Sequence, residues 1–192
     1  MAFAALLVAA LALVFTIGSF WWLHARTGSL EAPRPRTYAF ANRVHADLGP
    51  PLVRLRLPLA FFNTGAKALV VSDLRIVLDD EPTRRPFEWM TTRTALRADE
   101  QDGFAFPTPF AVAGRSTKEA IAEFGDDLGW SPSPRSPHRM RLQAKIHPTE
   151  AWRDVTAFEW WAPPSEEIMT KYIAHRNAPT QAETGPDTDA RA

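Results

Sequence analysis

The chain has 192 residues, which is enough for one domain of ordinary size with an anchor and a tail. Its 22 Lys and Arg residues balance its 22 Asp and Glu residues, so net charge gives no reason to expect a nucleic acid partner. The absence of cysteine excludes disulfides, thiolate metal sites and a thiol nucleophile.

The N-terminal segment, residues 1–23, contains no charged side chain. A helix of this length covers about 30 Å, which matches the hydrocarbon core of a bilayer. Phe20, Trp21 and Trp22 end the segment where aromatic side chains would meet lipid headgroups, and His24 and Arg26 follow at headgroup level. We therefore predict a transmembrane anchor over residues 1–25, with the bilayer as its partner through residues 1–23.

Two other interpretations compete with a retained anchor. A cleaved signal peptide carries basic residues before its apolar segment and small residues at its cleavage site, whereas here nothing basic precedes the segment and bulky aromatic residues end it. A buried core helix would carry a polar stripe, which this segment lacks. The pattern therefore favours a single-pass protein of the cell membrane.

The side of the membrane that carries the domain is a separate question. Basic residues close to a membrane tend to stay in the cytoplasm. The stretch after the apolar segment holds more basic than acidic residues: Arg26, Arg34, Arg36 and Arg43 against Glu31 and Asp47. This bias favours a domain on the cytoplasmic side.

Residues 26–50 have the composition of a linker, with room for an edge strand near 37–40. The chain then alternates apolar and polar residues with the period of half-buried strands, and its 17 prolines favour loops and sheet edges. The expected strand segments are 53–61, 69–78, 87–92, 104–112, 117–124, 139–147 and 155–161. This spacing predicts a mainly β fold, an antiparallel immunoglobulin-like β-sandwich over residues 51–163.

The C-terminal part of the chain changes character after the predicted sandwich. Ser165 can cap a helix, and the two glutamates that follow it suit a first helical turn. We therefore predict a short C-terminal helix over residues 164–176. The stretch 177–192 is small and polar, which is typical of a disordered tail.

Several short motifs, taken together, are similar to those of a known group of proteins. They are FWW at 20–22, RTGSL at 26–30, PRTYA at 35–39, LPLAFFNTG at 57–65, VSDLR at 71–75 and FAVAGR at 110–115. The chain resembles uncharacterised bacterial single-pass membrane proteins that pair a short N-terminal anchor with a β-sandwich domain. The similarity spans roughly residues 15–160. It implies membrane attachment and a β-sandwich, and it transfers no activity.

The sequence contains none of the motifs that carry chemistry. Its histidines lack the spacing of a zinc helix, and its acidic runs at 79–81 and 126–127 read as solvated turns. Ser116 lacks the glycine pattern of a nucleophile elbow. The basic row along 139–145 suits either anionic lipid or, more simply, the solvated side of a sheet. We therefore predict no catalytic, cofactor or metal site.

Two classes of function remain. The first is a membrane-tethered interaction module that presents loops or an edge strand to a protein partner and catalyses nothing. The second is a membrane-anchored ligand-binding protein or enzyme with its site in the sandwich loops. Because no acid, base and nucleophile candidates converge in the sequence, we favour the interaction module.

Overall fold

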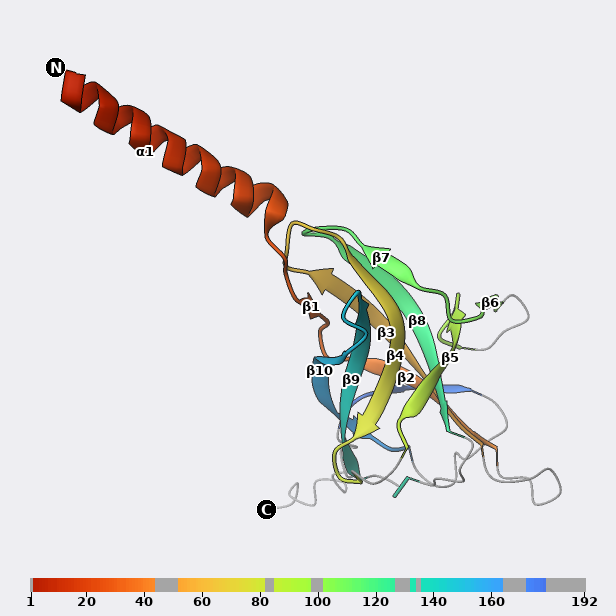
Figure 1. The fold of residues 1–192 in the computed structure, drawn as a ribbon. Coiled ribbons are helices and arrows are strands. Elements are labelled where there is room, and N and C mark those ends of the chain that lie inside the picture. The colour runs from red at the N-terminus through yellow and green to blue at the C-terminus, as the bar shows by residue number, and fades with distance from the viewer. Residues whose placement is uncertain are drawn as a thin grey trace, which may run out of the picture.

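The computed structural model describes residues 2–43, 52–81, 85–97, 102–126, 132–133, 136–163 and 172–178. Helix α1 (Ala2–Phe20) continues into a π-helical turn, η1 (Trp21–Ala25), and the two form a rod that projects away from the remaining chain (Figure 1). No residue of α1 is buried. The stretch Ala2–Ala25 is long and apolar enough to cross a membrane, so the predicted N-terminal apolar helix is confirmed.

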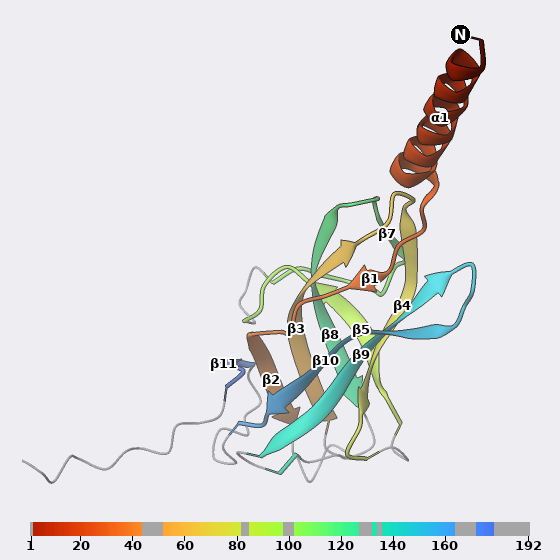
Figure 2. The same ribbon diagram turned by 90° about the vertical axis from the view of Figure 1, so that its left-hand side faces the viewer.

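The residues after the rod form an antiparallel β domain. Its strands are β1 (Leu30–Glu31), β2 (Thr37–Arg43), β3 (Leu52–Asn63), β4 (Leu69–Leu78), β5 (Phe87–Arg93), β6 (Phe104–Ala105), β7 (Phe110–Val112), β8 (Thr117–Asp126), β9 (Pro137–His147), β10 (Trp152–Trp161) and β11 (Ile173–Arg176). Their order is β10-β9-β4-β5-β8-β3-β2-β11, with β1 beside β3, β6 beside β5 and β7 beside β4. The sheet curls into a half-barrel (Figures 1 and 2).

The mainly β prediction is confirmed, but the immunoglobulin-like sandwich of two separate sheets is wrong. Strand β5 joins the would-be layers because it pairs with β4 on one side and β8 on the other. Irregularities at Val71/Asp73, Trp89/Thr91 and Asp154/Thr156 interrupt the strand registers, and such bulges bend and twist strands. A period of two specifies which face of a strand is buried; it does not specify whether those faces belong to one curled sheet or two flat ones.

The inner face of the half-barrel follows directly from the alternation in the sequence. The inward residues of β3 are almost inaccessible, with exposed fractions of 1% for Leu55, 0% for Leu57, 3% for Leu59 and 0% for Phe61. Burial of a large aliphatic or aromatic side chain is worth about 1.5–3 kcal/mol. The core that these residues share with β4, β8, β9 and β10 therefore specifies the register of each strand.

The two ends of the curled sheet meet at one seam. Trp160 on β10 packs against Tyr38 and Phe40 on β2, with ring centroids 5.5 and 5.3 Å apart. Asn177, just after β11, accepts a hydrogen bond from Trp161 N (3.0 Å) and donates to Glu159 O (2.8 Å). Side chains, rather than a continuous backbone ladder, thus connect β10 to the β2 end of the sheet.

The predicted C-terminal helix over 164–176 is wrong where the structure describes it, because Ile173–Arg176 form strand β11. The outer edge of β2 offers backbone partners to this segment, and Ala174 pairs with Ala39 there. Residues 164–171 lie outside the described residues, as does the predicted tail beyond Ala178. The strand expected near 37–40 is β2, which lies between β3 and β11 and is not an edge.

Candidate functional site

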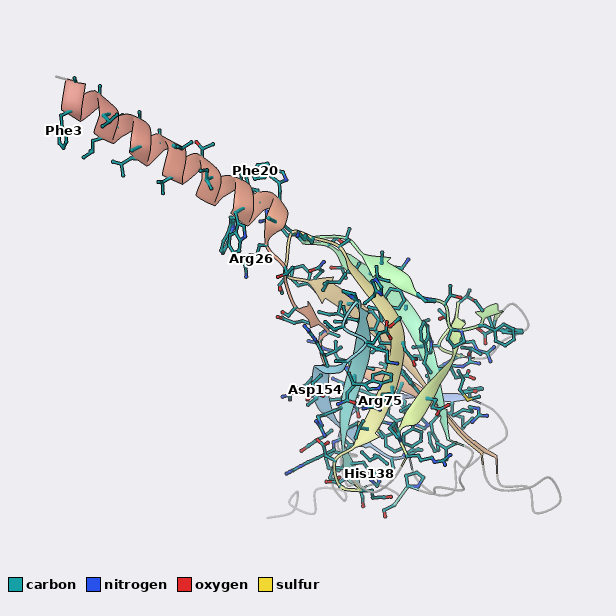
Figure 3. All side chains as sticks on the ribbon, viewed as in Figure 1. Phe3, Phe20, Arg26, Arg75, His138 and Asp154 are labelled. Atoms are coloured by element: carbon teal, nitrogen blue, oxygen red, sulfur yellow. The ribbon has the colours of Figure 1, made fainter. Side chains whose placement is uncertain are left out.

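The residues predicted for the membrane interface lie at the end of the rod that meets the domain, as the labels Phe20 and Arg26 show in Figure 3. Phe20 packs on His24 with ring centroids 4.9 Å apart, and the Arg26 guanidinium lies 4.2 Å from the Trp22 ring. Trp21 and Trp22 remain 54% and 53% exposed. The rod therefore ends in a collar of aromatic and cationic groups, the chemistry that suits a lipid headgroup layer.

The backbone that follows the rod is docked onto the loop between β3 and β4. Ala66 N donates to Arg26 O (2.8 Å), and Thr64 N donates to Ser29 O (3.1 Å). Ser29 N in turn donates to Thr64 Oγ1 (2.9 Å). We call residues 26–29, 63–67 and 113–115 the anchor junction. Its first segment is part of the folded domain and not a free linker.

Two glycine contacts make the anchor junction this close. A Cβ added to Gly28 would lie 1.8 Å from Gly65 N, and a Cβ added to Gly114 would lie 1.9 Å from Ala66 O. Both distances are far below any tolerated contact, so larger residues would separate the segments. The three glycines Gly28, Gly65 and Gly114 therefore fix how near the rod stands to the sheet.

Asn63 shapes the loop that receives the rod. It is fully buried at the end of β3, where Nδ2 donates to Lys67 O (2.8 Å) and Val112 O (3.1 Å). Its Oδ1 accepts from Gly65 N (2.9 Å), which is the local turn bonding that asparagine favours. A buried amide with all three bonds made holds β3, β7 and the loop in one arrangement.

Arg115 ties the domain to the rod itself. Its Nη2 donates to Trp22 O across 2.7 Å, which satisfies one of the carbonyls that a helix leaves unpaired at its C-terminal end. Its backbone has φ 54°, a left-handed conformation that residues other than glycine rarely adopt. Arg115 is not among the site residues predicted from the sequence, although an arginine directly after Gly114 in a turn is a signal that points to it.

A buried charge cluster lies on the outer side of β3, β5 and β8. Arg56, only 1% exposed, donates through Nε to Glu123 (2.7 Å) and through Nη1 to Asp102 (2.8 Å). Arg93 also bonds Glu123 (3.0 Å). Burial lowers the pKa of Arg56, but the bonds to Glu123 and Asp102 outweigh it and raise that pKa above its ordinary value. The two positive charges thus match two negative ones.

Tyr172 covers one face of the charge cluster. The Arg56 guanidinium lies 3.8 Å from the centroid of the Tyr172 ring, which covers it. Burial, followed by the charge of Glu123, raises the pKa of Tyr172 to about 12, so its phenol stays protonated near neutral pH. Breaking a buried charge network by removing one partner costs about 3–5 kcal/mol. We conclude that the cluster holds the Asp102 segment and Tyr172 on the sheet.

The basic row predicted on β9 is largely neutralised in the fold. Arg141 bonds Asp79 (2.6 Å) and Asp154 (3.2 Å), and Gln143 donates to Asp154 (2.7 Å). The bond from Gln143 is the main reason that the pKa of Asp154 lies below its ordinary value. Figure 3 shows Arg75 and Asp154 on this side of the domain. Such a face is the solvated side of a sheet and lacks the excess of positive charge that anionic lipid requires.

A proline-bordered arch, Pro33–Arg36, leaves the sheet between β1 and β2. Within the described residues, β3 has no strand neighbour on that side over 57–61, between its pairings with β1 and β2. Pro58, inside this interval, has no N–H to offer a neighbour. Asn177 Nδ2 donates to Pro35 O (3.1 Å) and so links the arch to the edge of β10.

Two clefts flank the arch. One, of about 730 Å³, lies between the arch and residues 157–161 of β10, and we call it the β10 cleft. The other, of about 520 Å³, lies between the arch and the adjoining parts of β3 and β8. Arg34 and Arg36, both exposed, line both clefts, and Arg139 lines the first. In the described part of the chain, no three His, Asp or Glu side chains gather as metal ligands would.

Comparisons with known proteins add little to this geometry. No protein family and no curated protein matches the chain. A solved structure described as "Crystal structure of protein from Archaeoglobus fulgidus" is similar over 79% of this chain and 98% of its own length, at 10% sequence identity and a TM-score of 0.30. Of what the resemblance to single-pass membrane proteins implies, the structure itself contains the N-terminal apolar helix and a large antiparallel sheet.

We predict that Tyr172 makes the domain lose stability in alkali. Its pKa of about 12 in the folded state exceeds the ordinary 10.0, so the stabilisation is complete below pH 10 and is lost as the pH rises through 12. Between about pH 9 and about pH 11.5, the free energy of unfolding should fall by roughly 2 kcal/mol more than in Tyr172→Phe. Urea unfolding of both proteins in detergent measures this; identical pH dependences would contradict it.

We predict that Arg115→Ala loosens the anchor junction. Loss of the bond to Trp22 O should cost about 1 kcal/mol and raise the rate of tryptic cleavage after Arg26 about fivefold. The matched control is Lys118→Ala, which removes an exposed cation from the neighbouring strand β8 and should leave the rate unchanged. An equal rate in Arg115→Ala and wild type would show that the contact does not hold the junction.

Proposed function

We propose that the chain is a membrane-tethered interaction module: α1 and η1 stay in the bilayer as a single-pass anchor, and the β domain meets a protein partner without catalysing a reaction. The observation that carries this proposal is the anchor junction, where Arg115 and the β3–β4 loop bind the backbone at the end of the rod. A domain attached in this way is held next to the membrane surface in one orientation, as an interaction module that meets a partner there requires.

The same contacts favour a retained anchor over a cleaved signal peptide. Cleavage beyond Trp22 would remove the carbonyl that Arg115 Nη2 binds, and with it one of the hydrogen bonds that hold this residue in its left-handed conformation. No residue of α1 is buried, so in water the rod would leave an apolar surface of the kind that proteins bury. The resemblance to bacterial single-pass proteins points the same way.

The burial and pairing of the polar groups favour a binding function over a catalytic one. The charge cluster is mostly buried, its charges are matched and its tyrosine stays protonated near neutral pH. The arch and the β10 cleft, by contrast, are open and carry unpaired backbone and exposed arginines. A membrane-anchored ligand-binding protein or enzyme is the alternative, because a cleft of about 730 Å³ falls within the range of small-molecule sites.

We place the domain on the cytoplasmic side. All four arginines that support this side, Arg26, Arg34, Arg36 and Arg43, lie within the described residues, and basic residues near a span resist export. Arg26 is the nearest of them, since its guanidinium packs on Trp22 at the end of the rod.

We predict that the intact chain behaves as an integral membrane protein. It should stay in the membrane pellet after alkaline carbonate extraction, because about 20 apolar residues in a helix strongly prefer lipid. A chain without residues 1–25 should be recovered in the soluble fraction. N-terminal sequencing of the mature protein supplies the control. A first residue beyond Trp22, or an intact chain that is soluble without detergent, would contradict the anchor.

We predict that a reporter fused after Ala192 is active only in the cytoplasm. A fluorescent protein that folds in the cytoplasm and a phosphatase that requires export give opposite signals, so each serves as the control for the other. Introducing glutamate at Arg26, Arg34 and Arg36 together should weaken the orientation and raise the phosphatase signal. Phosphatase activity from the unmodified chain would place the domain on the other side.

A further inference from the structure

We infer that the β10 cleft binds an extended, acidic peptide segment of a partner protein, which adds to the edge of β10 as a further strand. This inference rests on the proposed function, because it names the surface and the partner chemistry through which a tethered module would act. Three features of the cleft carry it: an unpaired strand edge, the space beside that edge, and the charge around the space.

The edge of β10 is only partly occupied. Asn177 binds Glu159 O and Trp161 N, so the backbone groups of these alternate residues point away from β9. The period of two then directs the N–H and C=O of Ala157 and the N–H of Glu159 the same way. Within the described ranges these three groups have no hydrogen-bond partner. Asn177 thus binds two backbone groups of this edge as a neighbouring strand would. The N–H and C=O of Ala157 and the N–H of Glu159 are available to pair with an added strand.

The arch leaves space for such a strand. Pro33 and Pro35 carry no N–H, so the arch is poorly equipped to pair with the edge that it faces. A cleft of about 730 Å³ separates the two. Phe158 and Trp161 contribute apolar surface to its lining, which suits the apolar residues of an alternating peptide.

The charge around the cleft selects an acidic segment. Three exposed arginines line it: Arg34, Arg36 and Arg139. Two carboxylates also line it: Asp79, which Arg141 already binds at 2.6 Å, and the exposed Glu159. The net charge of the side chains that line the cleft is positive, so the cleft attracts acidic side chains of a peptide and repels basic ones.

The test uses the full chain in detergent and two synthetic fluorescent peptides, one alternating glutamate and valine and one alternating lysine and valine. We expect saturable binding of the acidic peptide alone, measured by fluorescence anisotropy. In the nuclear magnetic resonance spectrum the backbone amides of Ala157 and Glu159 should shift and gain protection from hydrogen exchange. Equal binding of the two peptides, or shifts that spare both amides, would overturn the inference.

Two variants separate charge from strand pairing. Arg34→Glu with Arg36→Glu should weaken binding about tenfold, whereas the matched pair Lys118→Glu with Arg153→Glu, exposed and outside both clefts, should change it less than about twofold. Ala157→Pro removes an edge N–H that β9 does not use, so it should abolish binding with little change in the thermal unfolding temperature. Ala157→Ser is its control. Unimpaired binding by Ala157→Pro would overturn strand addition.

Other occupants and the proposed function are distinguished by separate results. Binding that appears only after truncation beyond Ala178 would make the chain's own C-terminal segment the occupant, and saturation by inorganic phosphate in competition with the peptide would make the cleft a small-anion site. Either result overturns the inference. If the chain stays in membranes and crosslinks to a protein partner but binds no peptide, the inference alone fails. If the intact chain is soluble and crosslinks to nothing, the proposed function fails whatever the peptide does.

Discussion

The close packing of residues 26–29 on the β3–β4 loop is the constraint on which the remaining structure depends. Gly28 and Gly65 approach so closely that neither tolerates a side chain, and backbone bonds to Arg26 and Ser29 lock the approach. Arg115 adds a bond to the end of the rod itself. The end of the apolar helix is thereby attached directly to the curled sheet.

The second constraint is the seam where the half-barrel almost closes. Tyr38, Trp160 and Asn177 connect the two ends of the sheet through rings and a side-chain amide. A closed barrel would have removed every strand edge, whereas here side chains bridge the two ends of the sheet. The arch and its clefts exist because the backbone does not finish the seam. The surfaces of this domain that could bind a partner therefore lie where the half-barrel does not close.

Much of the fold could be predicted from the sequence because its signals are local. The uncharged N-terminal segment and the alternation along residues 53–61 and 139–147 each specify one element, and the structure contains those elements. The curl could not be predicted, because it depends on bulges and on β5 pairing with both β4 and β8. Strand β11 was mistaken for a helix because its pairing with β2, more than 130 residues away in sequence, decides its conformation.

The site residues show the same division. Phe20 to Arg26 were found because they follow an apolar segment directly in the sequence. Arg115 lies 93 residues from its partner Trp22, and Arg56 lies 67 residues from Glu123, so no short pattern joins either pair. Arg56 and Glu123 look solvated in the sequence, but both are buried, because the fold brings opposite charges next to them. Pairing of this kind becomes visible only once the strands have a register.

The short connection between the anchor junction and the arch sets how far apart they stand. Arg34, in the arch, follows Ser29, in the junction, by five residues, and five residues of extended chain span at most about 18 Å. That distance is roughly twice the Debye length of about 8 Å at physiological salt. Counter-ions therefore weaken the interaction between the arginines of the arch and lipid charges at the foot of the domain without removing it. A change in the anionic lipid content of the leaflet would alter the electrostatics of the arch more at low ionic strength than at high ionic strength.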